Sequence, residues 1–233
     1  MLEALALLTS LGGARPLTAR AVPWFPVVGA VLGGALGVLW WGADQIWPAP
    51  VAVAVVVAAD LALTGMLHLD GLVDSADGLL PHLDEDRRLA VMAEPAVGAF
   101  GLGVGVAVVL LRWVALAAID VRPATLIAVW ITGRAVMTVA LLTVAPARPE
   151  GMASSVAGGS TAIGLGSATV ATGIAAGLLA TAPGSVVPLA GALVGAAVVL
   201  IARRRIGGVT GDVLGAAGIL TETGALLLAA ARW

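Results

Sequence analysis

Apolar stretches recur along this chain, and each is about 20 residues long, the length that an α-helix needs to cross the hydrocarbon core of a bilayer. Gly, Pro or charged residues bound each stretch, and about seven spans can be placed in this way. They lie near residues 24–43, 50–69, 98–118, 124–145, 161–181, 185–202 and 213–231. Hydrophobic residues make up 60% of the 233 residues and charged residues 11%, which excludes a soluble domain. We predict an all-α fold: a polytopic membrane helical bundle that forms one domain over residues 1–233.

The N-terminal segment, residues 1–13, carries Glu3 and lacks the basic residues that begin a secretory signal peptide. We expect it to form a short interfacial or re-entrant helix that stays in the mature protein. Most of the arginines lie in or beside the segments that share the side of the N-terminus: Arg15, Arg20, Arg87, Arg88, Arg148, Arg203, Arg204 and Arg205. By the positive-inside rule, this bias predicts a cytoplasmic N-terminus.

The overall charge and the cysteine count exclude other classes of site. A net charge of −2 leaves no basic face for a nucleic-acid partner. The chain has no cysteine, so it forms no disulfide and no thiolate metal site.

Three aspartates follow the second apolar stretch directly. If the segment stays helical, Asp70, Asp74 and Asp77 occupy positions i, i+4 and i+7, so their side chains point within one narrow arc. Three like charges on one face repel one another, and a divalent cation that prefers carboxylate oxygens would neutralise them. The alternative is a solvated helix end. Gly71 and Gly78 favour a site, because they leave room for a bulky anion to approach the backbone.

A second polar segment, residues 203–212, joins the last two spans and combines three arginines with glycines and a hydroxyl. The backbone N–H groups of such a turn, together with the N-terminus of the following helix, favour a phosphate. Arg203, Arg204 and Arg205 alone are typical of a positive-inside anchor, and Asp212 alone of an ordinary helix N-cap. Taken together, the residues of this segment predict an anion site on the same face as the aspartates.

Charged residues also occur inside the predicted spans, where an unpaired charge is costly. We expect Arg134 either to bind an anion that enters from the cytoplasmic side or to form an internal ion pair, for instance with Asp60. Asp60 is expected to pair with Arg134 or Arg112, with proton coupling as the alternative, and Arg112 could instead extend to the interface. Glu222 lies about three turns after Asp212, and the spacing does not decide whether it faces the aspartates.

Two long motifs resemble those of a known family. Residues 68–78, His-Leu-Asp-Gly-Leu-Val-Asp-Ser-Ala-Asp-Gly, closely resemble the signature of the cobalamin synthase (adenosylcobinamide-GDP ribazoletransferase) family, and residues 207–216, Gly-Gly-Val-Thr-Gly-Asp-Val-Leu-Gly-Ala, resemble its C-terminal signature. Segments 92–101, 133–134 and 148–151 follow in the order of the family, and Glu222 matches an acid of its last helix. The resemblance implies a multi-pass enzyme of the bacterial cytoplasmic (inner) membrane, with its active site on the cytoplasmic face. It would join adenosylcobinamide-GDP to α-ribazole or its 5′-phosphate, release GMP and use Mg²⁺.

The resemblance and the residue chemistry together assign roles to individual side chains. Mg²⁺ is expected on Asp70, Asp74 and Asp77, with Asp212 and Glu222 holding a second ion or orienting the first. The candidate catalytic residues are Asp74, Asp77 and His68, because an aspartate or a histidine could accept the proton of the attacking hydroxyl. The residues expected to contact the substrate are Arg134, Arg148, Glu150, Gly207, Gly208, Thr210 and Gly211.

One segment departs from the family pattern. In residues 92–98, Glu94 stands where an aspartate is usual, and the basic residue of the loop is missing. A small-molecule or ion-coupled transporter is the alternative function, and it would need a polar path past Asp60 and Arg134 to the outer face. A non-catalytic membrane scaffold is a third possible function. The sequence leaves a homo-oligomer open.

Overall fold

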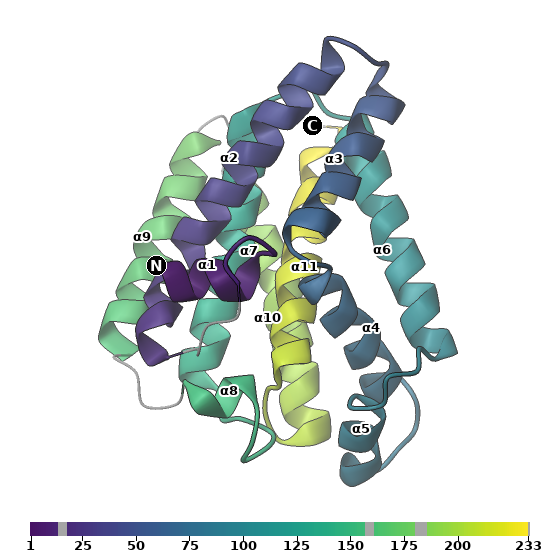
Figure 1. Ribbon diagram of the computed structural model, residues 1–233, viewed down its shortest axis with the longest axis vertical. Helices are drawn as coiled ribbons and strands as arrows, with labels where there is room; N and C mark the ends of the chain where they lie inside the picture. The colour runs from purple at the N-terminus through teal and green to yellow at the C-terminus, as the bar shows by residue number, and fades with distance from the viewer. Residues whose placement is uncertain (14–17, 157–160, 180–185, 233) are drawn as a thin grey trace.

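The computed structural model describes residues 1–13, 18–156, 161–179 and 186–232 (Figure 1). Within these ranges the protein is helical, and the one β-like feature is an isolated bridge between Pro146 and Val209. The helices are α1 (Leu2–Leu8), the 3₁₀-helix η1 (Ala19–Trp24), α2 (Phe25–Asp44), α3 (Ala49–Leu63), α4 (Leu67–Leu79), α5 (Glu85–Val91), α6 (Ala99–Ala117), α7 (Pro123–Thr143), α8 (Met152–Ser155), α9 (Thr161–Leu178), α10 (Val187–Ile206) and α11 (Gly211–Ala229). The predicted all-α bundle is confirmed.

Six helical segments among the described residues are long and apolar enough to cross a membrane: Ala19–Asp44, α6, α7, α9, α10 and α11. The bent pair α3 and α4 brings the number up to 7 if it counts as one span. These segments agree with the predicted spans to within a few residues. Residues 14–17, 157–160, 180–185 and 233 lie outside the described part of the chain, and with them Arg15, Gly158 and the ends of two predicted spans.

The prediction of one continuous helix over residues 50–69 is wrong. α3 and α4 meet at an angle of 84°, because the chain leaves the helical conformation at Gly65 and Met66, whose φ angles are 57° and 59°. The N–H of Gly65 donates to the carbonyl of Ala62, and the N–H of Met66 donates to that of Leu61. These two bonds form a Schellman motif, in which the last carbonyls of a helix are satisfied by a left-handed glycine turn. The chain therefore begins a new helix, α4, which runs beside α6 (Figure 1).

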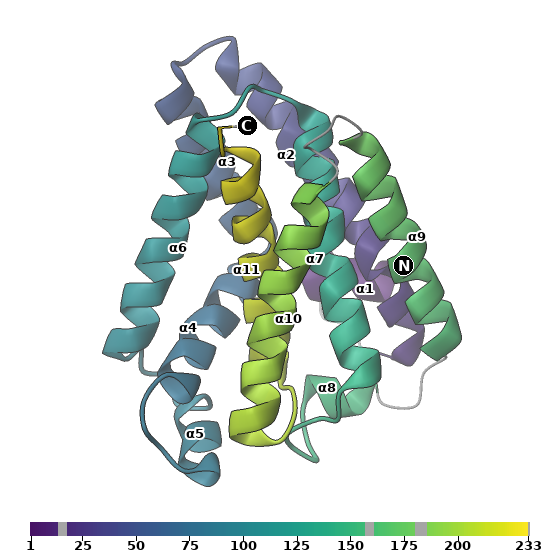
Figure 2. The same cartoon turned by 180° about the vertical axis from the view of Figure 1, so that it is seen from behind.

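α7 lies at the centre of the bundle, where it packs against α2, α9, α10 and α11 (Figures 1 and 2). α2 and α7 approach closely because two glycines of α2 face the α7 backbone. A Cβ atom on Gly29 would lie 2.5 Å from the carbonyl oxygen of Trp130, and one on Gly33 would lie 2.5 Å from that of Leu126. Close backbone approach through small residues is how membrane helices associate when lipid is as apolar as their side chains. Gly29 and Gly33 therefore form a packing seam between α2 and α7.

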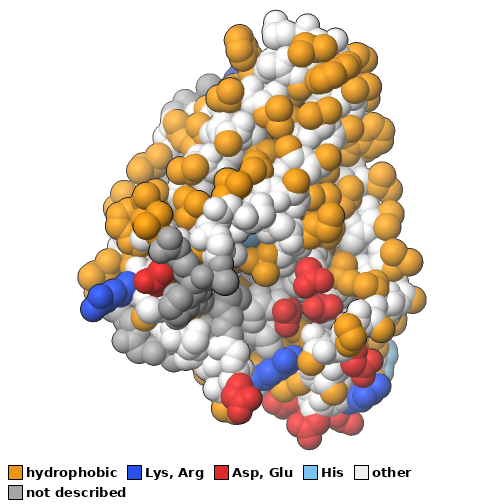
Figure 3. All heavy atoms as spheres, in the orientation of Figure 1, with side chains coloured by type: hydrophobic (Ala, Val, Ile, Leu, Met, Phe, Trp, Pro, Cys, Tyr) orange, Lys and Arg blue, Asp and Glu red, His pale blue; other side chains and the backbone are white. Residues whose placement is uncertain are grey.

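The outer surface is apolar over most of its height, and charged side chains gather toward the end that carries α5 and α8 (Figure 3). Large hydrophobic side chains such as Val38, Leu102 and Val170 are exposed on α2, α6 and α9. The inner side of α1 is not exposed: Ala4 and Leu8 are buried against the bundle. The exposed apolar belt is the surface that a bilayer would cover.

Three connections meet at the charged end of the bundle, which we call the polar end. It comprises the α4–α5 connection, the α7–α8 loop and the α10–α11 loop (Figure 1). The latter two loops are joined by backbone bonds: Ala147 N–H donates to Val209 at 2.9 Å, and Val209 N–H donates to Ala145 at 3.0 Å. Arg88 and Arg205 donate to the carbonyl of Leu79, at the C-terminus of α4. The polar loops predicted to share one face therefore lie at one end of the molecule.

Candidate active site

The aspartates of α4 lie on one helix, as their spacing predicts, but in three different environments. Asp70 is exposed, Asp74 is partly buried and Asp77 is buried. The charges of Asp70, Asp77 and Asp212 all lie close enough to repel that of Asp74. Asp212 belongs to the first turn of α11, so the acidic group spans two helices. The close approach of these helices depends on Gly71, where a Cβ atom would lie 2.7 Å from the backbone oxygen of Asp212.

Asp77 caps the N-terminus of α6. Its carboxylate accepts the N–H of Gly98 at 2.7 Å and that of Gly101 at 2.8 Å. A carboxylate is well suited to this position, because the first N–H groups of a helix lack partners within the helix and carry its positive dipole end. Asp77 was expected to bind metal and to act in catalysis; here its oxygens are engaged by the backbone, and it holds α6 against α4.

The α10–α11 loop is held in place by its own backbone and by a threonine cap. Gly207 has a φ angle of 71° and ends α10. Gly208 packs so closely on the α7–α8 loop that a Cβ atom would lie 2.3 Å from the carbonyl oxygen of Ala145. The Thr210 hydroxyl, which is the N-cap of α11, accepts the Val213 N–H at 3.2 Å. Asp212, considered as an N-cap from sequence, instead accepts a hydrogen bond from that hydroxyl at 3.2 Å.

A cavity of about 340 Å³ opens between these elements at the polar end. It brings together residues of α4, the α7–α8 loop and the start of α11: Leu67, Asp70, Arg148, Glu150, Gly151, Ala153, Val209, Thr210, Gly211 and Asp212. Arg148 donates from Nη2 to the Leu89 carbonyl at 2.8 Å, while its buried Nε has no partner among the described atoms. The positive charge of Arg148 acts on Asp212. Some of the predicted site residues therefore meet in this cavity, which we call the polar-end cavity. Others do not line it, among them Asp74, Asp77, Gly207 and Gly208.

His68, predicted as a candidate base, does not line the polar-end cavity. Its side chain is 4% exposed and lies in a small cleft with Leu8, Phe25 and Met137. Its Nε2 has no hydrogen-bond partner among the described residues. The imidazole packs against α11 near Gly218, where its Cδ2 would lie 3.7 Å from an added Cβ atom.

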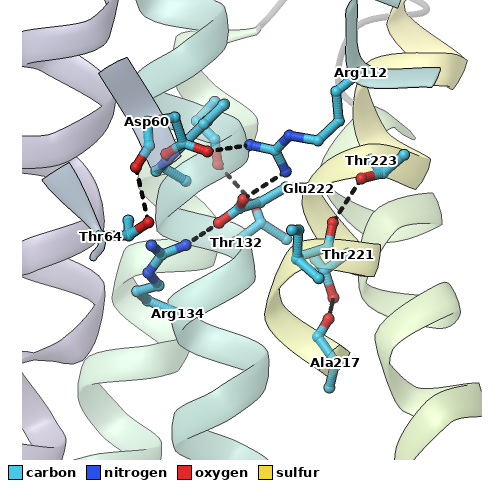
Figure 4. A network of polar contacts seen from close by, with 12 residues as sticks. Asp60, Thr64, Arg112, Thr132, Arg134, Ala217, Thr221, Glu222 and Thr223 are labelled. Atoms are coloured by element: carbon cyan, nitrogen blue, oxygen red, sulfur yellow. Dashed lines mark hydrogen bonds and ion pairs between the residues drawn. The ribbon is translucent and has the colours of Figure 1, made fainter. Parts of the chain in front are cut away.

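Four charged residues from four helices form a buried network at mid-height of the bundle (Figure 4). Arg112 of α6 donates to Asp60 of α3 at 2.7 Å and to Glu222 of α11 at 2.9 Å. Arg134 of α7 donates to the other carboxylate oxygen of Glu222. Trp130 donates its indole N–H to Asp60 at 3.0 Å, and its ring lies 4.9 Å from the Arg112 guanidinium. The four formal charges cancel, so the network satisfies charges that would be costly alone in the membrane interior.

This network decides between the alternatives that the sequence left open. Arg134 is 1% exposed, so it has no surface to offer a substrate, and its internal ion pair is formed with Glu222 instead of Asp60. Asp60 pairs with Arg112, one of its two expected partners, and Arg112 does not extend to the interface. Glu222 and Asp212 are ten residues apart on one helix, which is about 15 Å along its axis. Glu222 therefore does not share a metal ion with Asp212.

The described residues contain no preformed group of three or more His, Cys, Asp or Glu side chains that could hold a metal ion. Mg²⁺ does not need one, because it usually keeps several waters and binds through one or two carboxylates together with substrate phosphates. Asp70, Asp74 and Asp212 offer such carboxylates beside the polar-end cavity, and their mutual repulsion favours a cation. The donor set therefore fits Mg²⁺ bound jointly with a phosphate-bearing substrate.

Comparison with known proteins identifies the family of this chain. Residues 1–230 match the family model described as cobalamin-5-phosphate synthase. The chain belongs to this family. Three relatives named adenosylcobinamide-GDP ribazoletransferase are similar to it. That of Chlorobium phaeovibrioides is 36% identical over 85% of this chain and 82% of its own length, and that of Leptothrix cholodnii is 38% identical over 87% and 81%. That of Thermosynechococcus vestitus is 42% identical over 57% of this chain and 54% of its own length. No solved structure matches the chain.

Sequence reasoning missed several residues that organise the bundle. Trp130 joins the buried network, and a signal was present: it lies one helical turn before Arg134, so both face the same side. Arg88 and Arg205 hold the C-terminus of α4, which a preference for cations at helix C-termini could have suggested.

Proposed function

We propose that this protein is an adenosylcobinamide-GDP ribazoletransferase that works in the polar-end cavity. The observation that carries the proposal is the convergence of Asp70, Asp212, Arg148 and Thr210 in one cavity, in a chain whose relatives bear this name over four-fifths of their length. Acids that suit a metal ion and an arginine that suits phosphate are the groups that phosphoryl transfer requires. The transporter alternative is not favoured, because the charges at membrane depth are engaged in pairs and do not line a path.

The proposed substrates are adenosylcobinamide-GDP and α-ribazole or its 5′-phosphate. In the reaction, a ribose hydroxyl oxygen of α-ribazole, at a position other than the 5′ carbon so that a 5′-phosphate is retained, loses its proton and forms a bond to the phosphorus that carries the cobinamide arm. The bond from that phosphorus to the bridging oxygen breaks, and GMP leaves with this oxygen. The products are adenosylcobalamin, or its phosphorylated form, and GMP.

The residues in and beside the cavity take distinct roles in this proposal. Asp70, Asp74 and Asp212 would hold Mg²⁺, which neutralises charge on the pyrophosphate when it is bound. Arg148, which lines the cavity, contacts a phosphate oxygen. Asp74 accepts the proton of the attacking hydroxyl, since this carboxylate lies among other acids and makes no hydrogen bond to the described backbone. The N–H groups at the start of α11 orient the phosphate.

We further propose that the protein lies in the inner membrane of a bacterium and that the cavity opens on the cytoplasmic side. Arg87, Arg88, Arg148 and Arg205 at the polar end outnumber Arg122 and Arg232 at the other end, which agrees with the positive-inside rule. The orientation can be tested by cysteine accessibility. The chain has no native cysteine, so a single cysteine at Glu85 or at Asp120 reports one face without background.

The experiment for the function is GMP release by the purified protein in nanodiscs, supplied with adenosylcobinamide-GDP and α-ribazole 5′-phosphate. We expect metal-dependent release of GMP together with adenosylcobalamin phosphate, and none with EDTA. Asp74→Asn should remove activity while the protein stays inserted and folded. Asp120→Asn is the matched control, because Asp120 is exposed at the opposite end of the bundle. Near-normal turnover by Asp74→Asn would overturn the assignment of this carboxylate.

A further inference from the structure

A groove of about 670 Å³ runs between α7, α9 and α10, apart from the polar-end cavity. α7 lies between α9 and α10 (Figure 2) and contacts both, so it forms the floor and the other two helices form the walls. The positions that α10 contributes, from Ala192 through Ala196 and Val199 to Arg203, recur at helical spacing along one face. The groove is partly open to the outside of the bundle.

Apart from Arg203 at one end, the lining of the groove offers no free hydrogen-bond donor to a polar ligand. Most of it is Ala, Val and Gly, and it also contains Thr132, Thr143, Thr169 and Thr172. Each of these four hydroxyls donates to the carbonyl four residues earlier in its own helix, at distances from 2.7 to 2.9 Å. The four hydroxyl protons are therefore engaged within their own helices. A nucleotide, a metal ion or a sugar would lose hydrogen bonds to water on entering such a groove.

One charged residue of the described chain lines the groove, and it lies at the polar end. Arg203 is in the last turn of α10, is exposed and makes no ion pair with any described residue. The eleven helical steps from Ala192 to Arg203 correspond to about 16 Å of helix. This is roughly half of the 30 Å hydrocarbon core, or the depth of one leaflet.

We propose that this groove is a binding site for an anionic phospholipid, with one acyl chain along α7, α9 and α10 and its phosphate on Arg203. The apolar lining fits a methylene chain, the length fits a single leaflet, and the guanidinium fits a phosphate at the level where the headgroups of that leaflet begin. The site is independent of the transferase activity, since none of its residues lines the polar-end cavity.

Native mass spectrometry of the purified protein, released from nanodiscs that contain equal amounts of phosphatidylglycerol and phosphatidylcholine, tests the proposal. Wild-type protein should retain one phosphatidylglycerol molecule in preference to phosphatidylcholine. Ala196→Trp, which fills the groove, should lose the bound lipid. Arg203→Gln should keep a lipid but lose the preference for the anionic headgroup. Leu102→Trp is the control, because Leu102 faces outward on α6, on the other side of the bundle, and it should behave as wild type.

The opposite results would overturn the proposal. These are wild-type protein that retains no lipid, or an Ala196→Trp variant that retains as much as Leu102→Trp does. If Ala196→Trp does not fold, the smaller Ala196→Leu takes its place, and a monodisperse elution profile is required of each variant. A wild-type dimer that carries no lipid and that Ala196→Trp converts to monomer would show that a second copy of the chain occupies the groove instead.

Discussion

Replacing Glu222 by glutamine is expected to destabilise the protein strongly. In the native network two carboxylates balance two guanidiniums, and Glu222 contacts both arginines. The variant leaves one positive charge without an ion pair, because Arg112 keeps Asp60 at 2.7 Å while Arg134 pairs with no described acid other than Glu222. Removing one partner of a buried ion pair costs about 3–5 kcal/mol. For a chain of this length that corresponds to a fall in Tm of about 6–20 °C.

The measurement is thermal unfolding in detergent, followed by tryptophan fluorescence, which is sensitive here because Trp130 belongs to the network. Glu94→Gln is the matched control. The Glu94 pair with Arg87 is exposed on both sides, at 48% and 57%, so the same change should cost about 0–1 kcal/mol. A double variant, Glu222→Gln with Arg134→Gln, removes the uncompensated charge and should be more stable than Glu222→Gln alone.

The reasoning about this network can be refuted directly. Neutral interhelical hydrogen bonds in membrane proteins average about 0.6 kcal/mol. A loss no larger than this for Glu222→Gln, or a double variant less stable than the single one, would mean that the charges of the network do not compensate one another.

Two further substitutions separate structure from chemistry at the polar end. Asp77→Asn should lower the free energy of unfolding by about 1.5–3 kcal/mol, because the cap on Gly98 and Gly101 becomes weaker. The Mg²⁺ concentration for half-maximal GMP release should stay unchanged. A marked rise in that concentration would instead make Asp77 a metal ligand. Gly71→Ala should place a methyl group 2.7 Å from the backbone of Asp212 and force α4 and α11 apart. GMP release should then fall while the protein still inserts into the membrane. Normal turnover would show that the close approach of α4 and α11 is not needed.

The spans and their shared polar end could be predicted because hydropathy and arginine placement act locally along the chain. The helix break at Gly65 was harder to predict, since residues 50–69 are apolar enough to read as one span. Glycine alone does not end a helix. The break follows from two backbone bonds, to Leu61 and Ala62, that compete with helix continuation. Hydropathy carries no information about that competition.

The candidate site was predictable in part for a similar reason. Helical spacing correctly places Asp70, Asp74 and Asp77 on α4, but spacing along one helix does not reveal what stands opposite each residue. Asp77 faces the first N–H groups of α6, a partner 21 residues away in the sequence. Glu222 faces two arginines, one of them 110 residues away. Contacts of this range come from tertiary packing, which no local pattern encodes.

α11 connects the two polar regions of the molecule, the polar-end cavity and the buried charge network. Its first turn carries Asp212 into the polar-end cavity, and about 15 Å further along it Glu222 holds α6 and α7 through their arginines. Between membrane helices there is little hydrophobic driving force to fix one register over another, so polar links have more influence on the register. Because Glu222 connects α11 to α6 and α7, and Arg112 extends the link to α3, the network fixes the heights of four helices. These heights determine where α4 and the α7–α8 and α10–α11 loops meet, and therefore whether the cavity forms at all.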